Sequence, residues 1–266
     1  MSTANIRVGI GGWVFGAWRG SFYPSGLPQA RELEYAARRV TAIEINGTYY
    51  RSQSAKSFAA WAKAVPDDFV FTVKASRFCT NRRVLGEAGE SIERFLGQGL
   101  SELGGKLGPI LWQFMPTKQF DPDDFAAFLA MLPARRDGIS LRHALDVRHE
   151  SFRDPAFIAM ARKAGAAIVL TDSDTHPTIA DPTAGFSYAR LLRAREELPT
   201  GYSEAQLDHW ADVAKHWARG GRPEGFDYIE GEPPQSAGRD VFVFMINGAK
   251  LRAPAAAMAL IERLKG

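Results

Sequence analysis

The chain has 266 residues, of which 45% are hydrophobic and 24% are charged, a composition typical of a soluble globular protein. Its 33 Lys and Arg residues against 30 Asp and Glu give a net charge of +3, which permits a polyanionic partner without arguing for one. A single cysteine, Cys79, excludes an internal disulfide and a cysteine-rich zinc site. No apolar run approaches the roughly 20 residues that span a bilayer, and the N-terminus has no signal-peptide pattern. We therefore expect a cytoplasmic protein without a membrane partner.

Short apolar segments with the composition of buried strands alternate with helical patterns along the chain. The first segment leads into an aromatic loop that begins at Trp13. The fifth places Asp146 and Arg148 on one face of a strand that ends before His149. Eight strands are predicted, at residues 6–10, 42–46, 69–74, 109–114, 144–148, 166–171, 186–191 and 241–246.

Apolar positions at helical spacing and residues that favour helix ends predict helices between these strands. Asp121-Pro122 and Asp154-Pro155 each combine an N-cap aspartate with proline at the first helical position. Ser203 with Gln206 forms a capping box. The predicted helices cover residues 29–40, 58–65 and 92–103, the segments that begin at Asp121, Asp154 and Ser203, and a last helix carrying Met258, Ile261 and Leu264.

Eight strands that alternate with helices favour an α/β fold, a single (β/α)₈ TIM-type barrel, which typically takes about 250 residues. A doubly wound open sheet shares the alternation and is the competing fold. The glycines after the first strand are a poor dinucleotide fingerprint, because Val14 stands where the third glycine belongs, and we expect no cofactor. We expect one domain over residues 1–266, with the polar segment 222–238 as a loop insertion before the eighth strand.

Polar residues gather at the predicted carboxyl ends of the strands, where the active sites of barrels lie. Inward positions lower in a barrel normally carry Val, Ile and Leu, so polar ends on seven strands are hard to explain as packing. These residues are Glu44, Asn46, Lys74, Gln113, Asp146, Arg148, His149, Asp172, Arg190 and Asn247. The alternative is an ion-pair network that only plugs the barrel, although buried ion pairs contribute weakly to stability.

The first functional hypothesis is that the mouth of the barrel binds an anionic small molecule bearing a phosphate or a carboxylate. Lys74, Arg148 and Arg190 would hold the anion, since Arg suits bidentate recognition and Lys pairs as a point charge. A carboxylate would act as general acid or base, in a hydrolase or an isomerase. The candidate carboxylates are Glu44, Asp146 and Asp172, and the further ligand-binding candidates are Asn46, Tyr50, Arg77, Gln113, His149 and Asn247.

The second hypothesis is a nucleic-acid-binding protein. Arg77, Arg82 and Arg83 lie next to Phe78, a pattern that suits contacts with phosphates and bases, and Tyr50 could stack on a base. A solvated basic loop, with aromatic residues that only roof the barrel, is the alternative.

The third hypothesis is a metal-dependent hydrolase that uses His149 and His176 beside carboxylates. Neither histidine belongs to an H-x-x-x-H or H-x-H pair, so hydrogen-bonded loop histidines are the alternative. We expect no resident metal.

Motifs along the whole chain match those of a known family: Gly12-Trp13, Phe22-Tyr23-Pro24, Glu44-Ile45-Asn46 with Thr48, Tyr50 and Arg51, Lys74 with Arg77-Phe78, Leu107-Gly108-Pro109 with Gln113, Arg148-His149, Asp172, and Tyr188 with Arg190-Leu191. By these motifs the chain resembles the YecE-like family, a domain of unknown function with a TIM-barrel-type fold. The resemblance implies the barrel and carries over no activity. A looser likeness to endonuclease-IV-type barrels points to nucleic acid, but their histidine-rich metal site has no counterpart here.

The chain departs from the family pattern near the expected site. Ile10 and Gly11 replace a threonine and a serine, and Asp146 replaces a glutamate. Ile246 replaces an asparagine, and a histidine and an asparagine expected further on are missing near Ala253-Pro254. Segment 222–238 looks like an insertion relative to the family.

Overall fold

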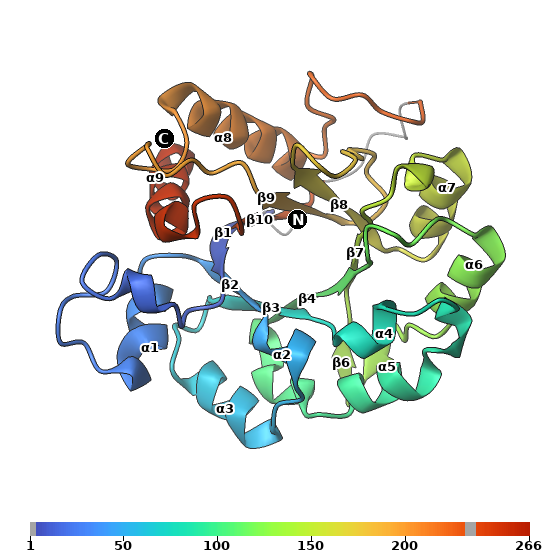
Figure 1. Ribbon diagram of the computed structural model, residues 1–266, viewed down its shortest axis with the longest axis horizontal. Coiled ribbons are helices and arrows are strands. Elements are labelled where there is room, and N and C mark those ends of the chain that lie inside the picture. Colours follow the sequence, from blue (N-terminus) through green and yellow to red (C-terminus); the bar gives the residue numbers. More distant parts are fainter. Residues whose placement is uncertain (1–3, 232–237) are drawn as a thin grey trace.

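The computed structural model describes residues 4–231 and 238–266, and in these ranges eight parallel strands close into a barrel. Figure 1 shows the strands in the centre of the molecule with helices around them. The order around the barrel is β1 (Ile6–Gly11), β10 (Asp240–Met245), β9 (Phe186–Leu191), β8 (Ala167–Asp172), β7 (His143–Asp146), β4 (Leu107–Gln113), β3 (Val70–Lys74) and β2 (Ala42–Ile45). The predicted barrel is confirmed, and the open sheet is excluded.

The helices begin where the sequence places caps. The Asp121 carboxylate accepts from two backbone amides at the start of α6, and Ser203 with Gln206 forms the capping box of α8. Across the described residues, no helix is long and apolar enough to cross a membrane. The helices are α1 (Glu32–Ala37), α2 (Gly47–Tyr50), α3 (Ala55–Lys63), α4 (Arg77–Thr80), α5 (Gly89–Leu96), α6 (Pro122–Ala130), α7 (Pro155–Lys163), α8 (Glu204–Ala218) and α9 (Ala253–Lys265).

Two predicted helices are shorter than their apolar patterns. The helix predicted over 92–103 ends at Leu96 and is followed by a 3₁₀ helix, Leu100–Lys106. Gly99 between them adopts φ 99°, a left-handed conformation that glycine tolerates and that interrupts an α-helix. The helix predicted over 29–40 starts as a 3₁₀ turn, Gln29–Arg31, and its α-helical part is α1.

A short hairpin, β5 (Arg135–Arg136) with β6 (Ile139–Ser140), was not predicted. Asp137 and Gly138 form its turn with φ of 48° and 79°, as a two-residue hairpin turn requires. Two-residue strands are too short for the periodicity of two to be recognised in the sequence.

Side chains alternate along the strands, so the inside of the barrel and the layer beneath the helices form separate clusters. Ile43 and Leu145 point outward and pack among the helices. The inward cluster is Ala42, Leu111, Ala144, Ala167, Val169, Phe186, Tyr188, Phe242 and Phe244. This apolar filling occupies the lower part of the barrel, and polar residues follow it at the carboxyl ends.

The described part of the predicted insertion, residues 222–231, packs on the outside of the barrel. The backbone amides of Ile229 and Glu230 donate to the buried Asp181 carboxylate at 3.0 and 2.9 Å. Arg153 pairs with Asp227. The rest of the insertion, residues 232–237, lies outside the described residues.

Candidate functional site

The inward faces of the strands end in a cavity of about 520 Å³ at the carboxyl end of the barrel. Strand ends and the loops after β2, β8 and β10 supply its walls. His176 and Lys250 reach it from two of these loops. The predicted candidates that line it are Asn46, Tyr50, Lys74, Gln113, Arg148, Arg190 and Asn247.

A buried layer of ion pairs forms the floor of the cavity. Arg190 donates from Nη2 to Glu44 Oε1 at 3.0 Å and from Nη1 to Asp146 Oδ2 at 2.6 Å, and both carboxylates are inaccessible to solvent. The Tyr188 hydroxyl donates to the second oxygen of Glu44 at 2.7 Å. Burial favours a lower pKa of Arg190, but Glu44 and Asp146 raise that pKa above its usual value. Both nitrogens at the end of Arg190 are therefore committed to the floor.

Arg148 lies above this floor and is joined to it through Asp146. Its Nη2 lies 3.1 Å from Asp146 Oδ2 and 2.9 Å from Gln113 Oε1. Burial alone would raise the pKa of Asp146, but Arg148 and Arg190 hold it below its usual value. Since Asp146 already pairs with Arg190, the Arg148 guanidinium, 15% exposed, keeps bonding capacity toward the cavity.

Lys74 is the cation of the cluster without a carboxylate partner. Among the described residues, its ammonium group has no ion pair and no hydrogen bond; it lies 4.1 Å from the ring centroid of Tyr49. The residue is only 8% exposed. Burial first, and then the charge of Arg190, lower the pKa of Lys74 to about 8. With Arg148 and Arg190, Lys74 makes three cations against two buried carboxylates, so the cavity wall carries excess positive charge.

Three residues that line the cavity also have a buried polar atom without a hydrogen-bond partner in the described part of the chain. These atoms are Asn46 Oδ1, His176 Nδ1 and Arg190 Nε. Buried polar atoms in proteins nearly always have a partner. The wall is therefore able to form more hydrogen bonds than the protein itself supplies.

Asp172 does not face the mouth, and this prediction is wrong. Thr171 points inward and donates to Asp146 Oδ1 at 3.4 Å, so strand alternation turns the next residue outward. Asp172 pairs with Arg193 at 3.3 Å in a separate side pocket that His209 also lines. Burial raises the pKa of Asp172 there.

His149 and Arg77 are also not among the residues that line the cavity. His149 is an N-cap: its Nδ1 accepts from the Ser151 amide at 3.1 Å, before the 3₁₀ helix Glu150–Phe152. Arg77 is exposed on α4, with its guanidinium 5.3 Å from the ring centroid of Phe78. Each lies three residues past the end of a strand, β7 at Asp146 and β3 at Lys74, in a segment where the periodicity of the strand no longer holds.

Lys250 was missed, and His176 was considered only as a metal ligand. Both come from loops, where no hydrophobic period indicates which way a side chain points. Lys250 lies 4.8 Å from the ring centroid of Phe15, a contact between segments far apart in the chain. Tyr188 appears in the family motif with Arg190 but was not among the candidate site residues, although it precedes Arg190 by two residues on the same face.

In the ranges 4–231 and 238–266, no group of three His, Cys, Asp or Glu residues is arranged to hold a metal ion. The Nδ1 atom of His149 lies 2.8 Å from the Ser151 hydroxyl. Cys79 is buried, and burial raises the pKa of its thiol to about 12. The metal-dependent hypothesis therefore has no ligand set in the described residues.

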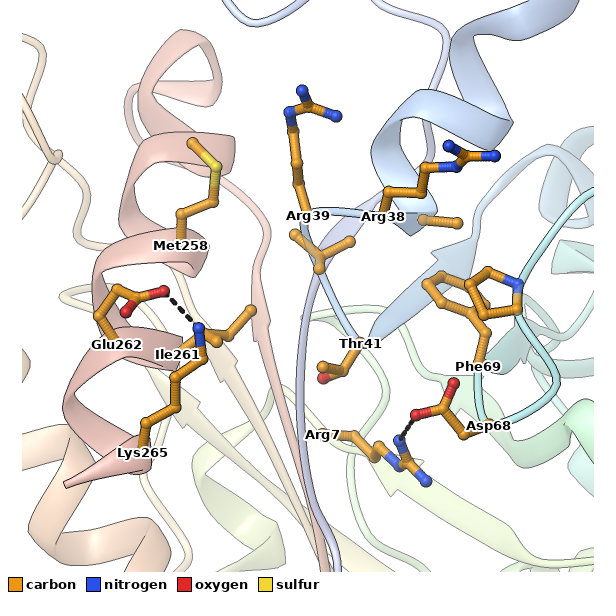
Figure 2. A pocket seen from close by; sticks show the side chains of 13 residues that line it. Arg7, Arg38, Arg39, Thr41, Asp68, Phe69, Met258, Ile261, Glu262 and Lys265 are labelled. Carbon is orange, nitrogen blue, oxygen red and sulfur yellow. Dashed lines mark hydrogen bonds and ion pairs between the residues drawn. The ribbon is translucent and has the colours of Figure 1, made fainter.

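A second pocket, of about 580 Å³, lies at the amino ends of the strands, between α1 and α9. Figure 2 shows Arg7 turned toward Asp68 and Lys265 toward Glu262, pairs that bring N and O to 3.8 and 2.6 Å. Arg38, on the same wall, is largely exposed and pairs with a glutamate of α1. The charged groups of this second pocket are paired or solvated, whereas Lys74 at the mouth is nearly buried and has no ion pair among the described residues. The mouth is therefore the stronger candidate site.

The sequence matches a protein family over almost its whole length. The family described as "Protein of unknown function DUF72" matches residues 7–266. The UPF0759 protein YunF of Bacillus subtilis is 24% identical over 201 residues, which cover 73% of this chain and 68% of YunF.

Solved structures share the same architecture. A DUF72 family protein of Thermotoga maritima aligns with a TM-score of 0.73 and 24% identity, over 98% of this chain and 100% of its own. One from Enterococcus faecalis aligns with a TM-score of 0.68 and 17% identity, over 99% and 98%. SacUVDE aligns with a TM-score of 0.54 and 7% identity, over 97% and 98%. At these identities the similarity shows a common fold alone.

Proposed function

Since the chain belongs to the DUF72 family, whose description names no activity, we propose a function from the cavity at the barrel mouth: it binds a small molecule that carries a phosphate or a carboxylate. We take the YecE-like resemblance as another description of the same family. One observation carries the proposal. Lys74 is a nearly buried ammonium on the cavity wall that forms no ion pair with a described carboxylate. Glu44 and Asp146 raise its pKa, but burial and Arg190 outweigh them, and a buried cation of this kind favours an anionic partner.

The residues divide into a floor and a binding wall. Arg190, with both terminal nitrogens on Glu44 and Asp146, supports the floor and positions the groups above it. Lys74 and Arg148 supply the charge for the anion, since Arg offers a planar fork and Lys a point charge. The amides of Asn46, Gln113 and Asn247 on the same wall complete its hydrogen bonds.

Both reaction classes considered above, hydrolysis and isomerisation, need a group that gives and takes protons. Glu44 and Asp146 are buried in ion pairs beneath the cavity, which ties their charges to Arg190. His176 lines the cavity, and burial with the charge of Arg148 lowers its pKa. An uncharged imidazole on the wall makes His176 the preferred general acid or base.

Nucleic-acid binding is the second candidate, and the rim of the mouth favours it. Tyr50 and Phe78 are 66% and 59% exposed, and both line a side pocket of about 370 Å³ that Arg51 and Arg82 also border. Tyr50 is shared with the mouth. A single-stranded nucleic acid with a phosphate at Lys74 and bases stacked on Tyr50 and Phe78 would bind with strong salt dependence.

Calorimetric titration with inorganic phosphate or malonate tests the main proposal. We expect one binding site per chain, and an affinity at least tenfold lower in Arg148→Ala. Arg195→Ala is the matched control, because Arg195 is 57% exposed and its ion pair among the described residues is with Glu197 at the surface. Binding that is absent from the parent, or equal in all three proteins, would overturn the proposal. Tighter binding of single-stranded oligonucleotides than of phosphate, with affinity falling steeply in salt, would favour the second candidate.

A further inference from the structure

Lys74 differs from two other largely buried lysines, Lys118 and Lys106, in a way that anion binding alone does not require. Lys118, also largely buried, has its Nζ 2.6 Å from Asp124 Oδ2 and 2.8 Å from the Arg83 carbonyl. Lys106 donates to two backbone carbonyls. Lys74 Nζ has neither kind of partner among the described residues, and it lies 4.1 Å from the centroid of the Tyr49 ring. Its lone pair, once the proton leaves, is free for chemistry.

The position of Lys74 is well defined by its surroundings. The Thr48 hydroxyl donates to the Lys74 carbonyl at 2.6 Å, which fixes the end of β3. The side chain enters the cavity that Arg148 and His176 also line. A lysine that is held, desolvated and next to another cation, here Arg190, has the arrangement of an activated amine nucleophile.

We propose that Lys74 forms a Schiff base with an aldehyde or ketone, and that this carbonyl compound carries the phosphate or carboxylate held by Arg148. The inference rests on the proposed function, because the bound anion brings the carbonyl carbon to the amine. It narrows the ligand from any anion to an anionic carbonyl compound of a size that fits a cavity of about 520 Å³.

The chemistry balances without an oxidant or a metal. The uncharged amine attacks the carbonyl carbon, a C–N bond forms, and the carbonyl π electrons move to oxygen. One amine proton passes to that oxygen, and the second leaves with the hydroxyl group as water, so that a C=N bond remains. His176 lines the cavity and is suited to carrying these protons, since burial and Arg148 lower its pKa.

The charge state of Lys74 supports this role. Burial and Arg190 hold its pKa at about 8, whereas an exposed lysine titrates near 10.4. At pH 7 the uncharged fraction of Lys74 is therefore on the order of a hundred times that of a surface lysine. The amine needs no separate base to become nucleophilic.

Reductive trapping tests the proposal. The protein is mixed with glyoxylate or glycolaldehyde phosphate and sodium cyanoborohydride, which reduces an imine to a stable secondary amine. We expect one adduct per chain in the intact mass, located at Lys74 by peptide mapping and formed at pH 7 at least ten times faster than at any other lysine. Uncharged glycolaldehyde should label Lys74 at least ten times more slowly.

Two variants complete the test. Lys74→Arg keeps the positive charge but cannot form an imine, so we expect it to lose the adduct. Lys118→Arg is the matched control: a buried, ion-paired lysine is changed, and labelling at Lys74 should be the same as in the parent. Labelling spread evenly over surface lysines, an equal adduct in Lys74→Arg, or no adduct in the parent would each overturn the imine proposal.

Calorimetry on the same samples distinguishes a failure of the Schiff-base proposal from a failure of the proposed anion-binding function. A parent that binds phosphate but gives no Lys74 adduct retains the anion site and loses the Schiff base. A parent that binds neither phosphate nor malonate overturns the proposed function itself.

Discussion

Arg190 on β9 and Glu44 on β2 form a fully buried ion pair across the inside of the barrel, with Nη2 3.0 Å from Oε1. The two strands are not neighbours in the sheet, so the pair ties opposite parts of the wall together. The plug and the anion site considered as alternatives are therefore two levels of one cluster. The lower level pairs its charges internally, and the upper level, with Lys74 and Arg148, carries the excess.

Arg190→Met is expected to lower the free energy of unfolding by about 3–5 kcal/mol, because it leaves Glu44 and Asp146 buried without their shared cation. Urea denaturation measures the change. Arg195→Met, at an exposed position, should cost less than about 1 kcal/mol. An equally small cost for Arg190→Met would show that the floor does not depend on this pair.

Arg148→Ala removes a charge from the upper level and leaves the ion pairs of Arg190 in the lower level in place. Asp146 keeps Arg190 as its partner in this variant, so we expect a loss of less than about 3 kcal/mol, the upper end for a hydrogen bond to a charged group. Millimolar phosphate should raise the thermal midpoint of the parent and leave that of Arg148→Ala unchanged. A loss of about 3–5 kcal/mol, with no phosphate effect in either protein, would favour a purely structural plug.

Lys74→Met should be more stable than the parent at pH 7. A pKa held at about 8 instead of its usual 10.5 means that the folded state resists protonation of Lys74, a cost of about 3 kcal/mol below pH 8. Between pH 8 and 10.5 the unfolded state binds more protons, so the stability of the parent rises toward that of the variant. Denaturation of both proteins at pH 7 and pH 10.5 checks this. A variant that is less stable at pH 7 would contradict the unpaired charge of Lys74.

Replacement of segment 222–238 by a short turn should leave phosphate binding unchanged, since none of its described residues lines the mouth. Stability should fall by about 1–3 kcal/mol, because the buried Asp181 carboxylate loses the amides of Ile229 and Glu230. Asp181→Asn within the intact loop is the companion variant. Weaker phosphate binding after the replacement would show that the segment reaches the site.

The floor of the site was predictable because strands repeat every two residues. Glu44, Asp146 and Arg190 each share a face with small or apolar inward residues, and the structure places all three inside the barrel. The prediction for Asp172 was wrong by one position. Thr171 is the inward residue of this strand, and the Asp172 side chain turns toward the helices. Counting from the last apolar inward residue, Val169, would have corrected it.

The upper wall depends on loops and was less predictable. Which way His176 and Lys250 point is decided by contacts between distant segments, such as Lys250 with Phe15. Local sequence does not contain this information. The helix break at Gly99 was only partly predictable from the sequence, because glycine permits a left-handed conformation without requiring one.

A high-resolution crystal structure of the protein grown with phosphate or its heavier analogue tungstate tests the central claim most directly. We expect the anion in the mouth cavity, within hydrogen-bond distance of the Arg148 guanidinium and the Lys74 ammonium and above the intact pairs of Arg190. Anions found only on the outer surface, with the mouth holding water alone, would contradict the account.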